Sequence, residues 1–375
     1  MNRATYIASL FTGAPQHENF SRLAEFIPAS TMTAAPVAYA FGEGPRIDLP
    51  SSFIHEGTPR DMEAFLKETD TMALFVLRDG LVRFERYAAF GGRDVPWASM
   101  SVAKSFISAL IGIAIDEGAI GSIEQPVTAY VPELAGSAYD GVRIKDILQM
   151  SSGAGWNEDY SDPESDIIRF SKVSADGGAM SGFIPTLGRA TTPGTVCHYN
   201  SMDTQVLGML LKAATGRSIA DYMQEKLWHP LGMESPGHWL LDSTGMEMAY
   251  ACLNATARDY AKIGELYRLG GHWLGRQLVP AEWVGASVTP DAPHLLPGVV
   301  DPLFGYGYQW WLIDGTEGEY SAIGVYNQFV YVNPTRGMTI VKLSANRNYG
   351  ATNDESSYRE HETIALFRAI CKHTG

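Results

Sequence analysis

The chain has 375 residues, 45% of them hydrophobic and 19% charged, so it can bury a large core as one large domain or two closely joined ones. Its 42 acidic residues outnumber 28 basic ones and give a net charge of -14, which excludes a basic face for nucleic acid or an anionic membrane. Three widely spaced cysteines, Cys197, Cys252 and Cys371, argue against a disulfide framework and fit a reducing compartment.

The apolar runs of the sequence match neither a secretory leader nor a transmembrane segment. The N-terminal run at residues 1–15 has one arginine and is too short and too interrupted by Thr and Gly for a secretory leader. No later apolar run reaches transmembrane length. We therefore expect a cytoplasmic protein.

The first half of the chain begins with an extended segment and a hairpin. Residues 26–45 are rich in Ala and Pro, which predicts an extended path over the surface. Residues 72–90 form two β-rich runs joined at Arg78, Asp79 and Gly80, and Asp-Gly between such runs is a strong hairpin signal. Two strands therefore precede the middle of the chain.

The middle of the chain has a helical pattern from about residue 101 to residue 270. Ser218 with Asp221, and Thr256 with Asp259, have the spacing of capping boxes. Glycines stand where helices should end, at Gly118, Gly216 and Gly270.

Aromatic and β-branched runs return after about residue 300, and a final helix is expected over residues 358–370. Strands at both ends of the chain around a helical middle predict an α+β fold. One antiparallel sheet would be built from distant segments, flanked by helices, with a mainly helical domain inserted.

A serine and a lysine at the start of a buried helix form the first chemical motif. In ASMSVAKSF (98–106), Ser101 and Lys104 are three residues apart and share one face of the helix that follows. A serine hydroxyl needs a base to become a nucleophile, and a lysine can serve if burial lowers its pKa toward neutrality. The alternative is structural, with Ser101 as a helix cap and Lys104 extending its charge to the surface.

Two later segments could complete such a site. Tyr199, Asn200 and Ser201 directly precede an amphipathic helix, so Tyr199 could relay protons from a loop, or could simply pack at a domain boundary. Gly324 lies within a strand and would let another backbone approach, so the Val325 amide could stabilise an oxyanion; the alternative is a simple bulge.

The order of these motifs, which spans nearly the whole chain, resembles the penicillin-recognition serine hydrolases. This family includes class C β-lactamases, DD-peptidases, esterases and 6-aminohexanoate-dimer (nylon-oligomer) hydrolases. Residues 140–160 and 227–239 are similar to the LLxHxSG and PLGM segments of the family. The resemblance implies a β-lactamase/DD-peptidase-like fold with a discontinuous α/β sheet domain, and a mainly helical domain at residues 119–254. The sheet domain would comprise residues 1–118 and 255–375.

By resemblance, Ser101 would be the nucleophile, Lys104 its base and Tyr199 the proton relay, with the amides of Ser101 and Val325 as the oxyanion site. The segments GVYNQ (324–328) and NEDY (157–160) look closest to the nylon-oligomer hydrolase and esterase branch. In that branch Tyr160 would face the substrate, and the expected substrate-binding residues are Tyr160, Trp156, Ser201, Gly324, Tyr326 and Gln328. We also expect an apolar pocket lined by aromatic side chains near these segments.

The predicted activity is hydrolysis of a carboxylic ester or linear amide through an acyl-enzyme, on a small molecule, without cofactor or metal, and with a homodimer as a possible state. Ala322-Ile323-Gly324 stands where class C enzymes have Lys-Thr-Gly, so an anchor for penicillin-type carboxylates is missing. A β-lactamase or DD-peptidase is the alternative enzyme, and a non-catalytic ligand-binding relative is the alternative outside enzymes. GxSxG, HExxH and P-loop motifs are absent from the sequence.

Overall fold

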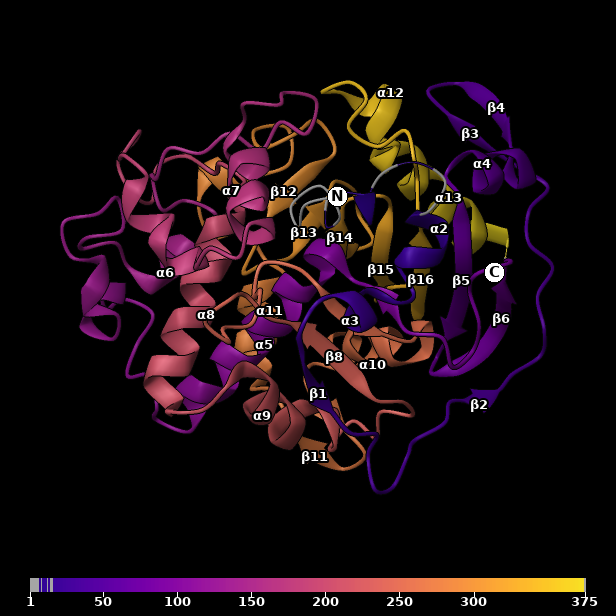
Figure 1. The fold of residues 1–375 in the computed structure, drawn as a ribbon. Coiled ribbons are helices and arrows are strands. Elements are labelled where there is room, and N and C mark those ends of the chain that lie inside the picture. Colours follow the sequence, from indigo (N-terminus) through magenta and orange to yellow (C-terminus); the bar gives the residue numbers. More distant parts are fainter. Residues whose placement is uncertain (1–6, 8, 12, 14–15, 374–375) are drawn as a thin grey trace.

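The computed structural model describes residues 7, 9–11, 13 and 16–373. The N-terminal run that we judged too short for a leader therefore lies largely outside the described residues. A mainly helical part, drawn chiefly from the middle of the chain, stands beside a part built on a large sheet (Figure 1). The sheet takes strands from both ends of the chain, so the predicted α+β architecture is confirmed.

The main sheet has eight strands within the described residues, in the order β12-β13-β14-β15-β16-β5-β6-β2. Thr339 of β16 faces Leu77 of β5, so the two ends of the chain pair directly. All neighbours are antiparallel except β2, which runs parallel to β6 at the edge. The strands are β2 (Gly42–Glu43), β5 (Thr71–Arg78), β6 (Leu81–Tyr87), β12 (Phe304–Tyr306), β13 (Trp311–Ile313), β14 (Tyr320–Gly324), β15 (Gln328–Asn333) and β16 (Met338–Ser344).

The predicted hairpin is the β5–β6 pair. Its two turn residues, Asp79 and Gly80, have φ angles of 52° and 74°. Two consecutive residues with positive φ form the turn whose twist matches that of the flanking strands. Arg78 and Leu81 face each other at the end of the ladder, so the hairpin prediction is confirmed.

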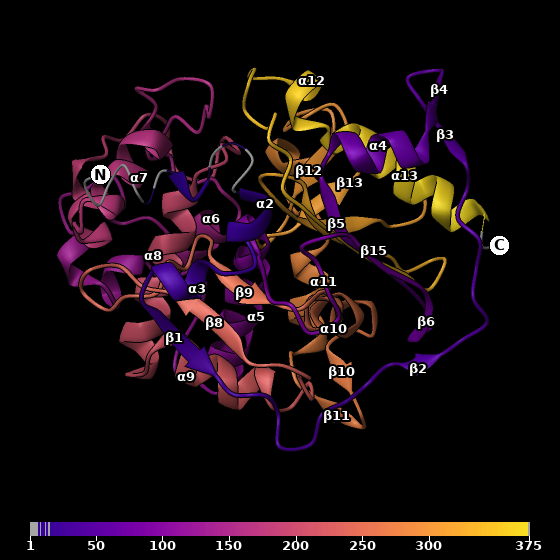
Figure 2. The ribbon, with the colours of Figure 1, turned by 45° about the vertical axis from the view of Figure 1, so that its right-hand side comes forward.

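Helices cover both faces of this sheet (Figure 2). On one face lies α10 (Ala257–Arg268), where Gly264 allows a close approach: a Cβ there would come within 2.7 Å of Thr339 Cγ2. On the other face, Phe367 of α13 (Glu360–His373) packs on Phe329 with ring centroids 5.6 Å apart. The sheet is therefore buried on both faces, with α4 (Met62–Glu68) beside α13.

The helical part is centred on α5 (Ala103–Asp116), whose residues 103–114 are all buried, and on α8 (Ser201–Thr215), which packs against it. The remaining helices are α2 (Gln16–Asn19), α3 (Leu23–Phe26), α6 (Ile144–Leu148), α7 (Asp166–Ala175), α9 (Ile219–Met223), α11 (Ala281–Ser287) and α12 (Glu355–Tyr358). A π-helical turn, η6 (Gln224–Trp228), follows α9. Short 3₁₀ turns lie at η1 (Met100–Val102), η2 (Val127–Ala129), η3 (Pro132–Leu134), η4 (Met180–Gly182), η5 (Ile184–Thr186) and η7 (Pro293–Leu295).

The helix ends follow the predicted caps. The Ser218 hydroxyl accepts the Asp221 N–H at the start of α9, and the Thr256 hydroxyl accepts the Asp259 N–H at the start of α10. Gly216 ends α8 in the left-handed conformation, with φ 66°. Local sequence therefore defines these boundaries.

The final helix is interrupted, unlike the single helix predicted over residues 358–370. Arg359 has a φ of 58°, which separates α12 from α13. A left-handed residue cannot continue a right-handed helix, so α13 begins at Glu360.

A second sheet, four-stranded in the described part of the chain, was not predicted. Its order is β1-β8-β9-β7. β1 (Ala29–Met32) comes from the segment expected to run over the surface, and β8 (Gly237–Leu240) lies within residues 119–254. Tertiary pairing with β1 and burial of Trp239 explain why β8 is a strand. The other strands are β7 (Trp97–Ala98), β9 (Leu253–Ala255), β3 (Ser52–His55) with β4 (Thr58–Asp61), and β10 (His272–Trp273) with β11 (Arg276–Gln277).

Candidate active site

The turn that carries Ser101 joins the two parts of the molecule. It is the 3₁₀ turn η1, which contacts β14 and β15 and leads directly into α5. Met100, just before Ser101, has a φ of 45°, a sparsely populated conformation for a methionine. The Ser99 N–H donates to Leu253 O at 2.7 Å and helps hold the turn. Ser101 is thus presented by a constrained backbone and is only 6% exposed.

Lys104 lies one turn further along and donates to Ser101 Oγ at 2.8 Å. Its Nζ also donates to Ser201 Oγ at 3.2 Å and to Tyr250 O at 2.7 Å. The side chain is 1% exposed, and this burial lowers its pKa to about 8, although the negative charge of Glu158 acts in the opposite direction. A neutral amine beside Ser101 is therefore accessible near physiological pH, which a lysine extending to the surface would not provide.

Tyr199 faces the same pair. Its ring centroid lies 5.2 Å from Lys104 Nζ, and its ring stacks on Trp311 at 5.2 Å. Burial raises the pKa of the Tyr199 phenol well above its usual value, partly opposed by a hydrogen bond with Ser101. The phenol therefore keeps its proton at neutral pH and can donate it to a neighbouring atom.

The end of β14 comes against the Ser101 turn from the other side. A Cβ on Gly324 would lie 2.6 Å from Ser99 O and 2.9 Å from Ser101 N, so only glycine fits here. Tyr326 and Asn327 follow with φ angles of 62° and 66°, which makes the β14–β15 connection a tight turn. The close approach expected at Gly324 is found, and Val325 lines the same cavity as Ser101.

Glu158 joins several site residues and was missed at the level of sequence. Its Oε1 accepts from Ser201 Oγ at 2.6 Å and from Tyr160 Oη at 2.9 Å. Its Oε2 accepts from Ser201 N at 3.0 Å and from Trp156 Nε1. The signal was present in GWNEDY, where one carboxylate stands two residues from each of two aromatic residues, but the spacing alone does not show that α8 closes over it.

A cavity of about 320 Å³ opens at Ser101. Among the residues expected to bind substrate, it is lined by Tyr160, Ser201 and Tyr326, together with Ser101 and Val325. The pocket is apolar, as predicted, and the aromatic residues of its lining are Phe11, Tyr160, Tyr250 and Tyr326. Most other lining residues are aliphatic, because α7 and the N-terminal segment close the cavity; they include Ile7, Ile27, Ile167, Ile168 and Leu240.

The other residues expected to contact substrate, Trp156, Gly324 and Gln328, are not among the residues that line the cavity. Gln328 is fully buried, and its amide donates to Val325 O at 3.2 Å and to Ser344 O at 2.7 Å, so it supports the β14–β15 turn. Trp156 is buried against Phe170 and donates to Glu158.

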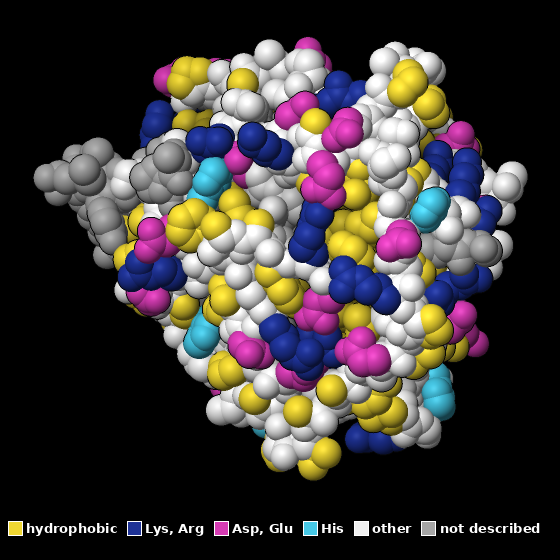
Figure 3. Space-filling model, turned by 90° about the vertical axis from the view of Figure 1, so that its right-hand side faces the viewer, with side chains coloured by type: hydrophobic (Ala, Val, Ile, Leu, Met, Phe, Trp, Pro, Cys, Tyr) yellow, Lys and Arg dark blue, Asp and Glu magenta, His cyan; other side chains and the backbone are white. Residues whose placement is uncertain are grey.

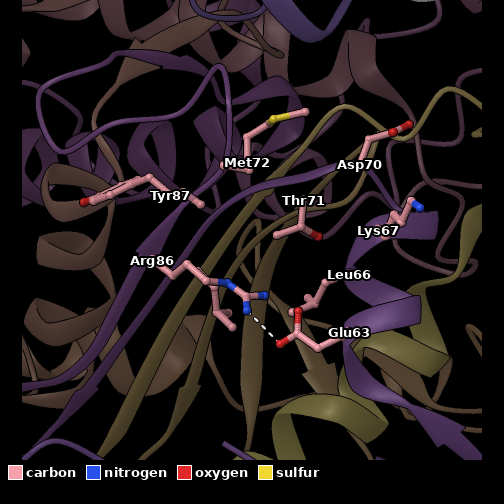
Figure 4. Close-up of a pocket in the computed structure, with 11 residues that line it drawn as sticks. Glu63, Leu66, Lys67, Asp70, Thr71, Met72, Arg86 and Tyr87 are labelled. Carbon is pink, nitrogen blue, oxygen red and sulfur yellow. Dashed lines mark hydrogen bonds and ion pairs between the residues drawn. The ribbon is translucent and has the colours of Figure 1, made fainter. Parts of the chain in front are cut away.

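A second hollow, the outer groove, lies on the far side of the sheet between α4 and the β5–β6 hairpin (Figure 4). Arg86 and Glu63 pair at 2.7 Å across it. Asp70 at its rim pairs with His17 and Arg347 at 3.0 and 3.1 Å. On the face of the molecule shown in Figure 3, basic and acidic side chains are likewise interspersed. Paired charges of this kind are typical of a hydrated surface rather than of a reactive site.

The described residues show neither a metal site nor a membrane-spanning helix. No cluster of three or more His, Cys, Asp or Glu side chains suited to a metal ion occurs there. None of the helices resolved between residues 7 and 373 has the length and apolarity needed to cross a membrane.

Comparisons with known proteins agree with this geometry. The sequence profile of the Beta-lactamase family matches residues 60–364, so the chain belongs to this family of hydrolases. The 6-aminohexanoate-dimer hydrolase of Paenarthrobacter ureafaciens is 32% identical over 337 residues, covering 87% of this chain and 84% of that protein.

Solved structures show the same fold. A Bacillus anthracis structure provisionally named a 6-aminohexanoate-dimer hydrolase has a TM-score of 0.86 and 24% identity, covering 97% of this chain and 96% of its own. EstCE1, a hydrolase with promiscuous acyltransferase activity, has a TM-score of 0.65 and 14% identity, covering 82% and 96%. The resemblance stated from the motifs and the β-lactamase-like fold are both confirmed.

Proposed function

We propose that this protein is a serine hydrolase that cleaves carboxylic esters or linear amides through an acyl-enzyme on Ser101. The observation that carries the proposal is the contact of Lys104 Nζ with Ser101 Oγ at 2.8 Å, in a site where burial brings the lysine pKa to about 8. A base is most effective when its pKa lies near the working pH.

The proposed reaction starts with transfer of the Ser101 hydroxyl proton to neutral Lys104. Ser101 Oγ then attacks the substrate carbonyl carbon, and the backbone N–H groups of Ser101 and Val325 stabilise the oxyanion. When the intermediate collapses, the bond to the leaving group breaks and the leaving atom receives a proton through Tyr199. Water then attacks the acyl carbon while the same groups take one of its protons; the bond to Ser101 Oγ breaks, the acid is released, and that proton passes to Ser101 Oγ.

Glu158 acts in this scheme as a positioning residue. It accepts from both Ser201 Oγ and Tyr160 Oη, and Ser201 Oγ in turn accepts from Lys104. Because the Tyr160 proton is directed to Glu158, the phenol oxygen can accept the N–H of a scissile amide. This arrangement supports amide as well as ester cleavage, and the name of the Paenarthrobacter relative supports a linear amide.

A β-lactamase or DD-peptidase is the less favoured enzyme. Ala322, at the position of the lysine in Lys-Thr-Gly, is 1% exposed, and Ala322-Ile323-Gly324 supplies no cation for a substrate carboxylate. A chromogenic cephalosporin that is hydrolysed as fast as a simple ester would favour that alternative.

Labelling of Ser101 tests the proposal directly. We expect p-nitrophenyl acetate to leave an acetyl adduct, seen by intact-mass spectrometry, on the parent and none on Ser101→Ala. Ser99 and Ser105 are matched controls, since their hydroxyls donate to Met100 O and Gln309 O, and their alanine variants should still be acetylated. An adduct that persists in Ser101→Ala would place the nucleophile elsewhere. A parent that resists both acetylation and a fluorophosphonate probe would favour a non-catalytic relative.

A further inference from the structure

The cavity beside Ser101, here called the acyl pocket, has an apolar wall made by separate segments. Helix α7 contributes Ile167, Ile168 and Ala175, and the N-terminal segment contributes Ile7 and Phe11. Residues 167 and 175 are eight positions apart on one helix, so at 1.5 Å per residue this wall extends about 12 Å. Leu240 and Met248 add further aliphatic surface. The pocket therefore has the shape and lining to hold a chain rather than a small acyl group.

Anionic groups are missing from this wall. Among the described lining residues the one charged side chain is Lys172, which is exposed and donates to Pro163 O at 3.3 Å. No carboxylate belongs to the lining in the described part of the chain.

Two carboxylates close to lining residues in the sequence, Glu158 and Asp242, already have partners. Glu158 accepts from Ser201, Tyr160 and Trp156. Asp242 accepts the N–H groups of Met180 and Met246, and both the N–H and the hydroxyl of Thr244. An ammonium group placed in the pocket would find no carboxylate among the described lining residues, and burial of an unpaired charge is strongly unfavourable.

We propose that the acyl pocket takes a neutral, apolar acyl chain of medium length and rejects an acyl chain that ends in an ammonium group. This inference rests on the proposed acyl-enzyme function, because the chain must begin at Ser101 Oγ. In the reaction, Ser101 Oγ bonds to the acyl carbon, the bond to the leaving group breaks, and the serine proton leaves with that group through Lys104 and Tyr199. The chain stays in the pocket until water releases the acid.

Two isosteric substrates separate a neutral chain from a charged one. Heptanoyl and 6-aminohexanoyl chains have the same number of heavy atoms, and the terminal methyl of the first is an ammonium in the second at pH 7. With p-nitrophenyl esters, we expect kcat/KM for heptanoate to exceed that for 6-aminohexanoate by about 100-fold or more. Equal rates, or a preference for the amino chain, would overturn the inference.

Chain length gives a second measurement on the parent protein. Each buried methylene should contribute about four-fold to kcat/KM. If the pocket buries three of the additional carbons of heptanoate, kcat/KM for heptanoate should exceed that for acetate by about 60-fold. Turnover of acetate without this gain would refute the acyl pocket while leaving the serine hydrolase intact. Failure of every ester, with no adduct on Ser101, would refute the proposed function and the inference with it.

A large side chain that fills the acyl pocket should remove the preference for heptanoate over acetate. Ala175→Trp places a large ring on the α7 wall, and we expect the heptanoate-to-acetate ratio of kcat/KM to fall at least about ten-fold. Ile54→Trp is the matched control, because Ile54 is 59% exposed on β3 and the same ring added there should leave the ratio unchanged. An unchanged ratio in Ala175→Trp would place the acyl chain elsewhere.

Discussion

Two buried lysine–serine pairs in this molecule have the same Nζ–Oγ distance and different surroundings. Lys104 contacts Ser101 Oγ, and Lys342 on β16 contacts Ser344 Oγ, each at 2.8 Å. Burial is the main cause of a lowered lysine pKa in both pairs. A short contact with a buried lysine whose pKa is lowered is therefore not sufficient to define a catalytic site.

Access distinguishes the two pairs. Ser101 opens into the acyl pocket, whereas Ser344 is fully buried and its hydroxyl lies 3.3 Å from Thr71 Oγ1, which separates it from the outer groove. Lys342 lies 5.7 Å from the Phe65 ring on the α4 side of the sheet, and its pKa is lowered further by Arg359. The pair that we propose to be reactive is the one beside a cavity and the end of β14.

The largest difference between the pairs should appear when each lysine is removed. We expect Lys104→Ala to lower the rate of Ser101 acylation by at least about 10³-fold, because the hydroxyl loses its base. Lys342→Met should keep ester turnover within about two-fold of the parent. Steady-state kinetics with p-nitrophenyl acetate and circular dichroism of each variant provide the comparison.

An arginine control shows whether Lys104 acts as a base. A guanidinium stays protonated, so Lys104→Arg should be as inactive as the alanine variant. Near-parental turnover in Lys104→Arg, or a comparable loss in Lys342→Met, would contradict the distinction drawn between the two pairs.

Tyr160 has no counterpart at the Lys342 pair and should matter for amides more than for esters. In the proposed function its oxygen accepts the N–H of a scissile amide, and loss of one such bond is worth about 1 to 3 kcal/mol, or roughly 5- to 150-fold in rate. We expect Tyr160→Phe to lower kcat/KM for a linear amide by this factor and to affect the matched ester much less. Equal losses on ester and amide would show that Tyr160 only shapes the pocket.

Glu158 should influence the protonation of Lys104 as well as its position. Its negative charge raises the pKa of Lys104, so Glu158→Gln should move the pH midpoint of ester turnover to lower values. We also expect about a ten-fold lower plateau rate, because the bonds to Ser201 and Tyr160 weaken. A lower rate with an unmoved midpoint would mean that Glu158 contributes structure alone.

Lys342→Met should change the free energy of unfolding rather than the activity. Since the folded pKa of Lys342 is lowered, the unfolded chain binds more protons between that pKa and 10.5, so the free energy of unfolding rises with pH across this window. Removal of the lysine should abolish this contribution and raise the free energy of unfolding at pH 7 by about 1 kcal/mol or more. Urea titrations of parent and variant at pH 7 and pH 9 measure both effects, and a destabilised variant at pH 7 would contradict them.

Features that depend on local sequence could be predicted. Ser101 and Lys104 are one helical turn apart, so their contact follows from helix geometry. The caps at Ser218 and Thr256 and the Asp79–Gly80 turn likewise need only neighbouring residues.

Features that depend on contacts between distant segments could not be predicted from the sequence. Glu158 contacts Ser201 because α8 brings the two residues together. The acyl pocket has an aliphatic wall because α7 and the N-terminal segment close over it. Gln328 was expected to face substrate, but the register between β15 and β16 directs it to Ser344. None of these contacts leaves a periodicity or a spacing in the sequence.

The central claim is that neutral Lys104 activates Ser101, and the pH dependence of acylation tests it most directly. The rate at which p-nitrophenyl acetate acylates Ser101 in a single turnover can be followed by rapid quench and intact-mass spectrometry. Because the reactive form is the unprotonated amine with a pKa of about 8, the rate should rise about ten-fold per pH unit below that value and level off above it. An acylation rate that is constant from pH 6 to pH 9 would contradict the account.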